Sequence, residues 1–367
     1  MREILGELIR WRDDGERAAL ARVVDVDGSA PRLPGAAMAV SESGEVVGSV
    51  SGGCVEGAAV SEALEILAQD APRLVSFGYS DDDAFAVGLT CGGTIHLYIE
   101  PVAWDEEAGV WPTLDAAVRA GEPVALATVV EGPRVGAKLL VGGDGRLRGS
   151  LGDPDLDRVA TRDARGALAG GATVVRHYGP HGEARESVVT LSIESFAPPP
   201  QMLVFGAVDF TRSLVRVAKI LGYRVTVCDA REVFATRQRF PEADEVVVDW
   251  PHRLLDRTGA ALGPRDAVCV LTHDHKFDIP AVMAALRTDV GYVGAMGSRR
   301  THEHRLERLR AEGATEPELD RLMSPIGLDL GARTPDETAI AICAEIIASR
   351  TGRPVPSLRD GRGPIHR

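Results

Sequence analysis

The stretch "GAAMAVSESGEVVGS", residues 35–49, returns further along the chain as "GAKLLVGGDGRLRGS", residues 136–150. Each stretch has an apolar segment, a turn that ends in glycine and a second short strand-like segment, which is the pattern of a β-hairpin. A helical pattern and further strands follow each hairpin. Repetition at a fixed spacing indicates one structural unit that occurs twice. The sequence therefore predicts an N-terminal α+β domain, residues 1–196, with two related halves at about 15–100 and 120–196.

The remainder of the chain has a different pattern. Between residues 202 and 350, near-continuous apolar runs such as "QMLVF" and "AVCVL" alternate with helical patterns, the first of them expected over Phe210–Leu221. This alternation is typical of a parallel sheet covered on both faces. We predict a Rossmann-like domain over 202–350, a proline-rich linker at 197–201 and a flexible tail at 351–367. The fold class is α/β overall, an N-terminal α+β domain with an internal repeat plus a C-terminal Rossmann-like parallel sheet.

Composition excludes several classes of protein. The 367 residues carry a net charge of −13, which disfavours nucleic acid as a partner because phosphate binding needs a basic surface. No apolar run approaches the length of a membrane span. The first twenty residues, "MREILGELIRWRDDGERAAL", have the pattern of an amphipathic helix rather than of a signal peptide. We therefore expect a cytoplasmic protein.

Five cysteines without a CxxC pair fit neither a disulfide scaffold nor a structural zinc site. Three of them, Cys228, Cys269 and Cys343, lie in apolar patterns and are interpreted as small core residues. The other two lie beside glycine pairs, in "SGGC" (51–54) and "TCGG" (90–93).

Both cysteine segments, together with "GSAPR" (28–32), occur in the first half only. The second half has Gly152–Asp155 in place of "SGGC", so the scaffold does not need these segments, and we predict that they form the binding site. The candidate residues there are Ser29, Pro31, Arg32, Gly52, Gly53, Cys54, Glu56, Cys91, Gly92 and Gly93.

The chemistry of "SGGCVEG" follows from its residue types. Gly52 and Gly53 allow the backbone to approach a ligand closely, and the first amides of the following helix point at whatever occupies its N-terminus. Such amides favour the thiolate of Cys54, which can ligate a soft metal, carry sulfur or attack an electrophile. The alternative is a glycine turn followed by a buried cysteine. Arg32, on a proline-stiffened loop, suits bidentate contact with a phosphate or carboxylate.

The dinucleotide fingerprint of the Rossmann-like domain is incomplete. G-x-G-x-x-G is replaced by Gly206–Thr211, which keeps only the first glycine. Val208 would crowd a pyrophosphate and Asp209 would repel it, although Asp229 stands where a ribose-binding acid belongs. The pattern therefore argues against conventional NAD(P) binding.

Two segments end strands of this domain, on the edge where open α/β sheets bind ligands. In "THDH" (272–275), His273 and His275 fall on one side of an extended chain and are candidates to share a metal or a phosphate. One histidine capping a helix, with the other solvated, is the alternative. In "GAMGSRR" (294–300), Gly297, Ser298, Arg299 and Arg300 are candidates for an anion site, with a solvated basic turn as the alternative.

Together with "GSVSGGCVEG", "GLTCGGTIHLYIEP" and "PIGLDLGARTPDETAIAICAEI", these motifs resemble the XdhC/CoxI family from about residue 15 to 350. Its members are accessory proteins of xanthine dehydrogenase and related molybdenum hydroxylases. The resemblance implies that the protein binds molybdenum cofactor (molybdopterin), protects it while a cysteine desulfurase replaces an oxo ligand with sulfido, and delivers it to the apo-hydroxylase. The family's GGC motif falls on Gly52, Gly53 and Cys54, and its CGG motif on Cys91, Gly92 and Gly93.

The expected function is therefore that of a maturation chaperone, with Cys54 as the metal ligand and no catalytic residue assigned. Expected partners are the apo-hydroxylase and the desulfurase, a homodimer being left open. An NAD(P)-dependent oxidoreductase is the alternative. The turn "GAVDFT" departs from the glycine-rich turn of many family members, which puts nucleotide binding in doubt.

Overall fold

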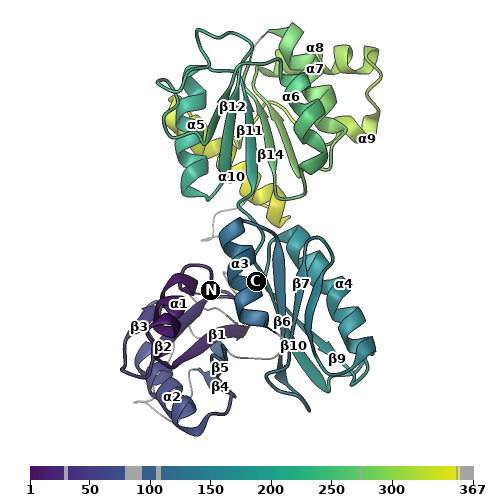
Figure 1. Cartoon of the computed structure of the whole chain (residues 1–367). Coiled ribbons are helices and arrows are strands. Elements are labelled where there is room, and N and C mark those ends of the chain that lie inside the picture. The colour runs from purple at the N-terminus through teal and green to yellow at the C-terminus, as the bar shows by residue number, and fades with distance from the viewer. Residues whose placement is uncertain (29–31, 79–92, 105–108, 273, 353, 356–367) are drawn as a thin grey trace. The chain divides into compact units, whose positions relative to one another are not determined.

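The computed structural model describes residues 1–28, 32–78, 93–104, 109–272, 274–352 and 354–355. These residues form two compact units that divide between Pro198 and Pro199, called unit 1 and unit 2 below (Figure 1). Each unit has apolar cores of its own.

Unit 1 contains two antiparallel sheets of five strands each. The first half comprises α1 (Leu5–Asp13), β1 (Ala18–Asp27), β2 (Ala37–Ser41), β3 (Val46–Gly48), α2 (Glu56–Gln69), β4 (Arg73–Phe77) and β5 (Thr94–Pro101). The second half comprises α3 (Val110–Ala120), β6 (Val124–Glu131), β7 (Lys138–Gly142), β8 (Leu147–Ser150), α4 (Pro154–Gly170), β9 (Val174–Tyr178) and β10 (Val189–Ser195).

The two sheets have the same topology. Their strand orders are β3-β2-β1-β5-β4 and β8-β7-β6-β10-β9. The repeated stretch forms the β2–β3 and β7–β8 hairpins, in which Val40 pairs with Val46 and Val141 with Leu147. The hairpin that the sequence predicts twice is therefore confirmed in both halves.

The N-terminal helix is shorter than expected. It ends at Asp13, and Gly15 takes a left-handed conformation with φ 76° before β1 begins. Residues 18–24 are buried along their whole length, so they pair into the sheet instead of extending an amphipathic helix. The expectation of a helix over residues 1–20 is wrong beyond Asp13 for this reason.

Two helices of unit 1 cover opposite outer faces. Helix α2 packs on the first sheet and α4 on the second, each with its own core (Figure 1). The inner faces of the sheets meet each other, and α1 and α3 fill one end of the space between them. Near the middle of that interface lies a buried ion cluster of Arg22, Glu100, Glu194 and Lys138.

Unit 2 is a six-stranded parallel sheet with helices on both faces. Its elements are β11 (Gln201–Phe205), α5 (Asp209–Ile220), β12 (Arg224–Cys228), β13 (Glu245–Val247), α6 (Pro251–Thr258), a 3₁₀ turn (Gly259–Ala261), β14 (Ala267–Val270), α7 (His275–Leu286), β15 (Tyr292–Ala295), α8 (Arg299–Ala311), α9 (Glu316–Leu319), β16 (Leu322–Met323) and α10 (Pro335–Thr351).

The strand order β13-β12-β11-β14-β15-β16 is that of a doubly wound Rossmann sheet. Helices α5 and α10 pack on one face, and α6, α7, α8 and α9 on the other. The predicted fold class is confirmed. The prediction that Cys228, Cys269 and Cys343 are core residues is also confirmed, since all three are buried.

Candidate functional site

The strand ends that border the three segments found only in the first half lie towards one end of the first sheet. Strand β1 finishes there, where Asp27 pairs with Thr94 at the start of β5. Phe77, the last residue of β4, pairs with Ile95 at the same end. Strand β3 also finishes towards this end, where Gly48 pairs with the second residue of β2.

The segments therefore begin or finish near one another. Arg32 is exposed in the β1–β2 connection, the "SGGC" loop follows β3, and Gly93 is buried directly before β5. Of the other residues predicted here, Ser29, Pro31, Cys91 and Gly92 lie outside the described residues.

The carboxylate of Glu56, the first residue of α2, lies inside the glycine loop. Its Oε1 accepts hydrogen bonds from the Ser49 hydroxyl at 2.8 Å and from the Ser51 and Gly52 amides at 2.9 Å each. Its Oε2 accepts from the Ser51 hydroxyl at 2.5 Å and from the Gly53 amide at 2.7 Å. Glu56 thus serves as an internal anion that the loop surrounds.

The pKa of Glu56 reflects these contacts. Burial raises it, but the hydroxyls of Ser51 and Ser49 and the Ser51 amide outweigh burial and lower the pKa to about 2. The carboxylate is therefore ionised at neutral pH. An anion fixed in this position stabilises the amides that surround it.

The expectation that the first amides of α2 point at a ligand stays a prediction. The amides that precede α2 are engaged within the loop itself. Those of Ser51, Gly52 and Gly53 donate to Glu56, and those of Cys54 and Val55 donate to the Ser51 hydroxyl at 3.0 Å each. The physical reason is that a carboxylate only a few residues away satisfies these donors without a ligand. Glu56, predicted as a cofactor-binding residue, is engaged with the loop itself.

The two glycines of the loop are exposed. Gly52 and Gly53 are exposed, and their φ values of 79° and 118° favour glycine. No described atom lies within 4 Å of a Cβ built on either residue. Beside them Cys54 is half-buried and packs against the core beneath α2. The exposed glycine backbone thus lies beside a half-buried thiol.

The second half contains a simpler form of the same arrangement. Asp157 takes the place of Glu56 and accepts from the Ser150 hydroxyl and the Leu151 amide, both at 2.7 Å. Helix α4 is capped separately by Asp153, which accepts from the Asp155 and Leu156 amides. Sequence reasoning missed the loop-holding carboxylate, although an acid at matching positions of both repeats was the available signal.

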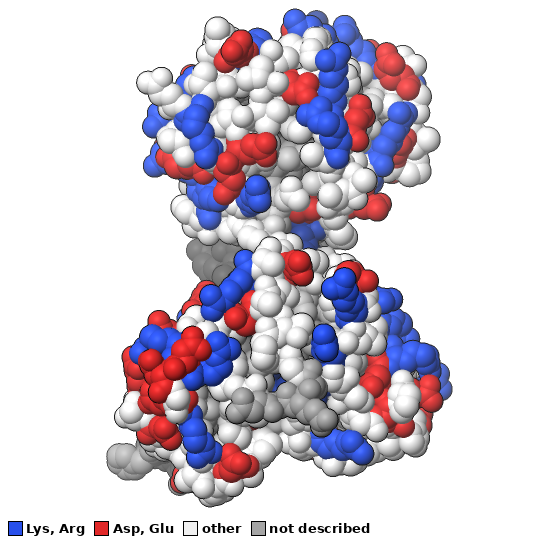
Figure 2. All heavy atoms as spheres, in the orientation of Figure 1, with Lys and Arg blue, Asp and Glu red and all other residues white. Residues whose placement is uncertain are grey.

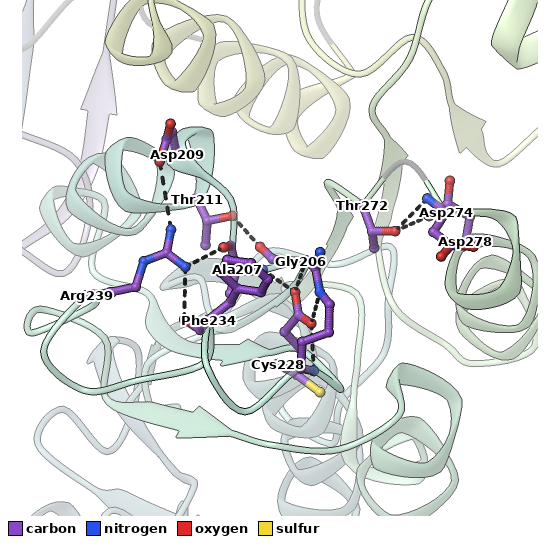
Figure 3. A network of polar contacts seen from close by, with 12 residues as sticks. Gly206, Ala207, Asp209, Thr211, Cys228, Phe234, Arg239, Thr272, Asp274 and Asp278 are labelled. Atoms are coloured by element: carbon purple, nitrogen blue, oxygen red, sulfur yellow. Dashed lines mark hydrogen bonds and ion pairs between the residues drawn. The ribbon is translucent and has the colours of Figure 1, made fainter.

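In unit 2, neighbouring side chains form hydrogen bonds with the backbone of the turn after β11 (Figure 3). The Ala207 amide donates to Asp229 Oδ2 at 2.8 Å, and the Ala207 carbonyl accepts from Arg239 at 3.0 Å. Arg239 also lies 3.8 Å from the Asp209 carboxylate (Figure 3). Gly206 is needed here because a Cβ on it would lie 2.9 Å from the Thr272 nitrogen.

Asp229 stands at the end of β12, where a ribose-binding acid was expected. Its carboxylate is 4% exposed and accepts from Arg231 Nε at 2.9 Å and Nη2 at 2.7 Å. Burial raises the pKa of Asp229, but Arg231 and the Ala207 amide outweigh burial and lower it. A ribose would have to displace the exposed Arg231 from this buried carboxylate.

The two histidines of "THDH" are not arranged as expected. His275 is the first residue of α7, because the Asp274 side chain accepts from the Lys276 amide and caps that helix. The expectation that both histidines lie along an extended chain is therefore wrong at His275, and His273 lies outside the described residues. The acid between them provides the cap that was expected of a histidine.

The segment "GSRR" begins α8. Ser298 is the N-cap residue, and its hydroxyl accepts from the Thr301 amide at 3.1 Å. Arg299 and Arg300 are exposed in the first turn, while Gly297 is half-buried before the cap. Their role in binding an anion stays a prediction.

A buried polar cluster at the same edge was not predicted. Asp278 accepts from the Thr272 hydroxyl at 2.7 Å and pairs with Arg305 at 3.3 Å. Burial raises the pKa of Asp278, and Thr272 and Arg305 oppose the rise. The cluster connects α7 and α8 to the end of a strand. The sequence does not predict it, because its members lie far apart along the chain.

The surface charges agree with the composition. On the face drawn in Figure 2, acidic and basic side chains are interspersed over both units and form no continuous basic surface. None of the helices in the described ranges has the length and apolar character needed to cross a bilayer. Within those same ranges, no three histidine, cysteine or acidic side chains are grouped as metal ligands.

Comparisons with known proteins agree with this architecture. A family model described as "XdhC Rossmann domain" matches residues 202–346, and one described as "XdhC and CoxI family" matches 11–78 and 117–179. A Bacillus subtilis protein named as a probable component of xanthine dehydrogenase is 28% identical over 340 residues, covering 92% of this chain and 94% of the relative.

Escherichia coli PaoD, named as a molybdenum cofactor insertion chaperone, is 26% identical over 349 residues, covering 95% of this chain and 88% of the relative. A crystal structure described as a xanthine dehydrogenase from Bacillus halodurans has a TM-score of 0.68 and 24% identity, covering 96% of this chain and 97% of that one. This last likeness shows the fold.

Proposed function

Because the chain belongs to the XdhC and CoxI family, we propose that it binds molybdenum cofactor and assists the sulfuration and insertion of that cofactor into a molybdenum hydroxylase. The names of its B. subtilis and E. coli relatives support a role in hydroxylase maturation. The proposed partners are the apo-hydroxylase and a cysteine desulfurase. We assign cofactor handling to the "SGGC" loop of unit 1.

One observation carries the proposal. Cys54 stands half-buried beside two exposed glycines in a loop whose glycine amides donate to Glu56. A thiol is a suitable donor for a soft metal, and the open glycine backbone leaves space for a large ligand. The second half, which has the same scaffold, has Asp155 at the matching position. Thus the feature is not required for folding.

The residues fit one part of the cofactor better than another. When bound, the cofactor supplies a molybdenum centre with exchangeable oxo and sulfido ligands. Cys54 would hold or face that centre. The loop amides are engaged with Glu56, so the phosphate of molybdopterin would need other donors, for which Arg32 is exposed at the same end of the sheet.

The experiment compares cofactor content in wild type, Cys54→Ser and the matched control Asp155→Ser. Each chain is purified from a host that makes molybdenum cofactor, and molybdopterin per chain and the thermal midpoint are measured. We expect Cys54→Ser to lose cofactor several-fold while its midpoint stays within a few degrees, and Asp155→Ser to match wild type. Unchanged cofactor in Cys54→Ser would remove the thiol from the mechanism. A large drop in its midpoint would identify Cys54 as a core residue.

The alternative, an NAD(P)-dependent oxidoreductase, is tested in unit 2. Both polar groups of Ala207 and the Asp229 carboxylate are already engaged, so we expect calorimetry to show no micromolar binding of NAD⁺ or NADP⁺. Micromolar affinity for either nucleotide would favour the alternative.

A further inference from the structure

A groove on unit 2 is lined by three arginines. Its cavity of about 510 Å³ lies beside helix α5, between the loop that follows β12 and the start of α10. Arg212 and Arg216 of α5 and Arg239 of the loop line it, together with the acids Asp209 and Asp336. A cavity of this size accommodates a small molecule. The function proposed above uses none of these arginines.

Two of the arginines, Arg212 and Arg216, are exposed and lie one turn apart on α5. In the part of the chain that the structure describes, neither guanidinium has an ion pair or a hydrogen bond. Like charges four residues apart on a helix repel each other. The chain has 54 acidic residues and 41 lysines and arginines, so acidic partners are not scarce. An anion bound between the two guanidiniums would remove this repulsion.

The third arginine, Arg239, is held by contacts within unit 2. Its Nη1 donates to the carbonyl oxygens of Ala207 at 3.0 Å and of Phe234 at 3.2 Å (Figure 3). Its guanidinium carbon lies 5.5 Å from the centroid of the Phe240 ring. A guanidinium that is already held in this way loses little side-chain entropy when it binds a further group.

The two acids of the groove do not cancel its positive charge. Asp336 accepts a hydrogen bond from the Ser213 hydroxyl, which connects α10 to α5. The Asp209 carboxylate lies 3.8 Å from Arg239 Nη2, beyond hydrogen-bond distance, and its side chain is 92% exposed. An exposed pair of this kind is weak. Three guanidiniums and two carboxylates thus leave the groove positive in a chain whose net charge is −13.

We propose that this groove binds the phosphate group of a small molecule between Arg212, Arg216 and Arg239. A phosphate carries nearly two negative charges at neutral pH and several acceptor oxygens, so it can accept hydrogen bonds from more than one guanidinium. A carboxylate has a single charge and would leave part of the cluster unpaired. Val208 and Pro335 also line the cavity and offer apolar contact to the rest of the molecule.

The proposed site differs from the pyrophosphate site of a dinucleotide-binding domain. In that site the donors are backbone amides of the turn after the first strand. In unit 2 the Ala207 amide of that turn donates to Asp229. The donors of the groove are instead side chains on α5 and in the loop after β12. The inference therefore requires neither NAD(P) binding nor the function proposed above.

The experiment uses the full chain and variants that remove one charge at a time. Arg212→Gln and Arg216→Gln each remove one guanidinium of the groove, and the double variant removes both. Arg253→Gln is the matched control, because Arg253 is also exposed on a helix, α6, which packs on the other face of the sheet. Calorimetry in phosphate-free buffer measures the binding of inorganic phosphate, pyrophosphate and phenyl phosphate. The thermal midpoint is measured with and without each of them.

We expect wild type to bind at least one of these probes and to gain thermal stability from it, because a ligand of the folded state raises the midpoint. The affinity should fall several-fold in Arg212→Gln and in Arg216→Gln, and further in the double variant. Arg253→Gln should match wild type. Without phosphate, the midpoints of the two single variants should not lie below that of wild type, since each substitution removes a repulsion.

The probes also distinguish between sources of the phosphate. Tighter binding of phenyl phosphate than of inorganic phosphate would identify an organic phosphate as the ligand, and equal affinity would identify the free ion. Neither heat nor a midpoint shift with any of the three probes would overturn the inference. An equal loss of affinity in Arg253→Gln would also overturn it, because the effect would then come from overall charge. Since no probe contains molybdopterin, the result is independent of whether the proposed function holds.

Discussion

Arg22 joins the two halves of unit 1 through charges that water does not reach. Its guanidinium pairs with Glu194 from the second sheet and with Glu100 from the first, the latter at 2.5 Å. Lys138 adds a contact of 2.8 Å to Glu100. Burial opposes the charge of Arg22, but Glu194 and Glu100 outweigh burial and raise its pKa. Such a cluster is stable only while all its members are present.

Replacing Arg22 should therefore lower the free energy of unfolding more than replacing an exposed arginine. We expect Arg22→Met to lower the free energy of unfolding by about 3–5 kcal/mol, because the buried carboxylates of Glu194 and Glu100 both lose the arginine and only Glu100 keeps the Lys138 contact described above. Arg17→Met is the control, since the exposed Arg17–Asp70 pair should contribute less than about 1 kcal/mol. Urea denaturation of both variants measures the difference. Equal costs would mean that the buried cluster contributes no more than a surface ion pair.

At the scale of the element, glycine is favoured in the loop and disfavoured in helix α2. Gly53 lies in the loop at φ 118°, where a side chain is strained even though no described atom blocks it. Gly57 lies exposed in the first turn of α2, and a Cβ there meets no described atom within 4 Å. Glycine at a helical position with negative φ costs stability because its backbone is freer in the unfolded chain.

The same substitution should thus have opposite effects four residues apart. Gly57→Ala should raise the free energy of unfolding by about 0.5–1 kcal/mol and leave bound molybdopterin unchanged. Gly53→Ala should lower stability by about 1–3 kcal/mol through backbone strain and reduce bound molybdopterin as well. Urea unfolding and cofactor analysis of the two variants test this. Retention of cofactor by Gly53→Ala would mean that the loop tolerates another shape.

At the scale of the whole molecule, the apolar cores divide cleanly between the units. The described core residues of unit 1 all come from residues 4–196, and those of unit 2 from residues 202–346. Each unit is also within the size range of an independent domain.

We therefore expect fragments 1–198 and 199–357 to fold separately. In calorimetry, each fragment should unfold in one cooperative transition, and the two midpoints should lie within a few degrees of those in the intact chain. A fragment without a cooperative transition would show that its core depends on the other unit.

The sequence by itself determined the features that depend on local pattern. The repeated hairpin of residues 35–49 and 136–150 and the buried parallel strands after residue 200 follow from hydrophobic periodicity and turn residues. The comparison of the two halves also identified "SGGC" as a candidate site, because the second half has the same scaffold without that segment. The end of α1 at Asp13 could not be predicted from the sequence, because a run of apolar residues is compatible with both a short helix and a buried strand.

Only the tertiary structure decided which polar groups meet. Glu56 accepts from the loop amides that precede its own helix, and Asp229 accepts from Arg231 and the Ala207 amide. Four charged side chains from both halves of unit 1 form the cluster around Arg22. Periodicity predicts which face of an element is apolar. The partner of a polar group depends instead on distances of a few ångströms between atoms brought together by the fold, and residue spacing along the chain does not carry that information.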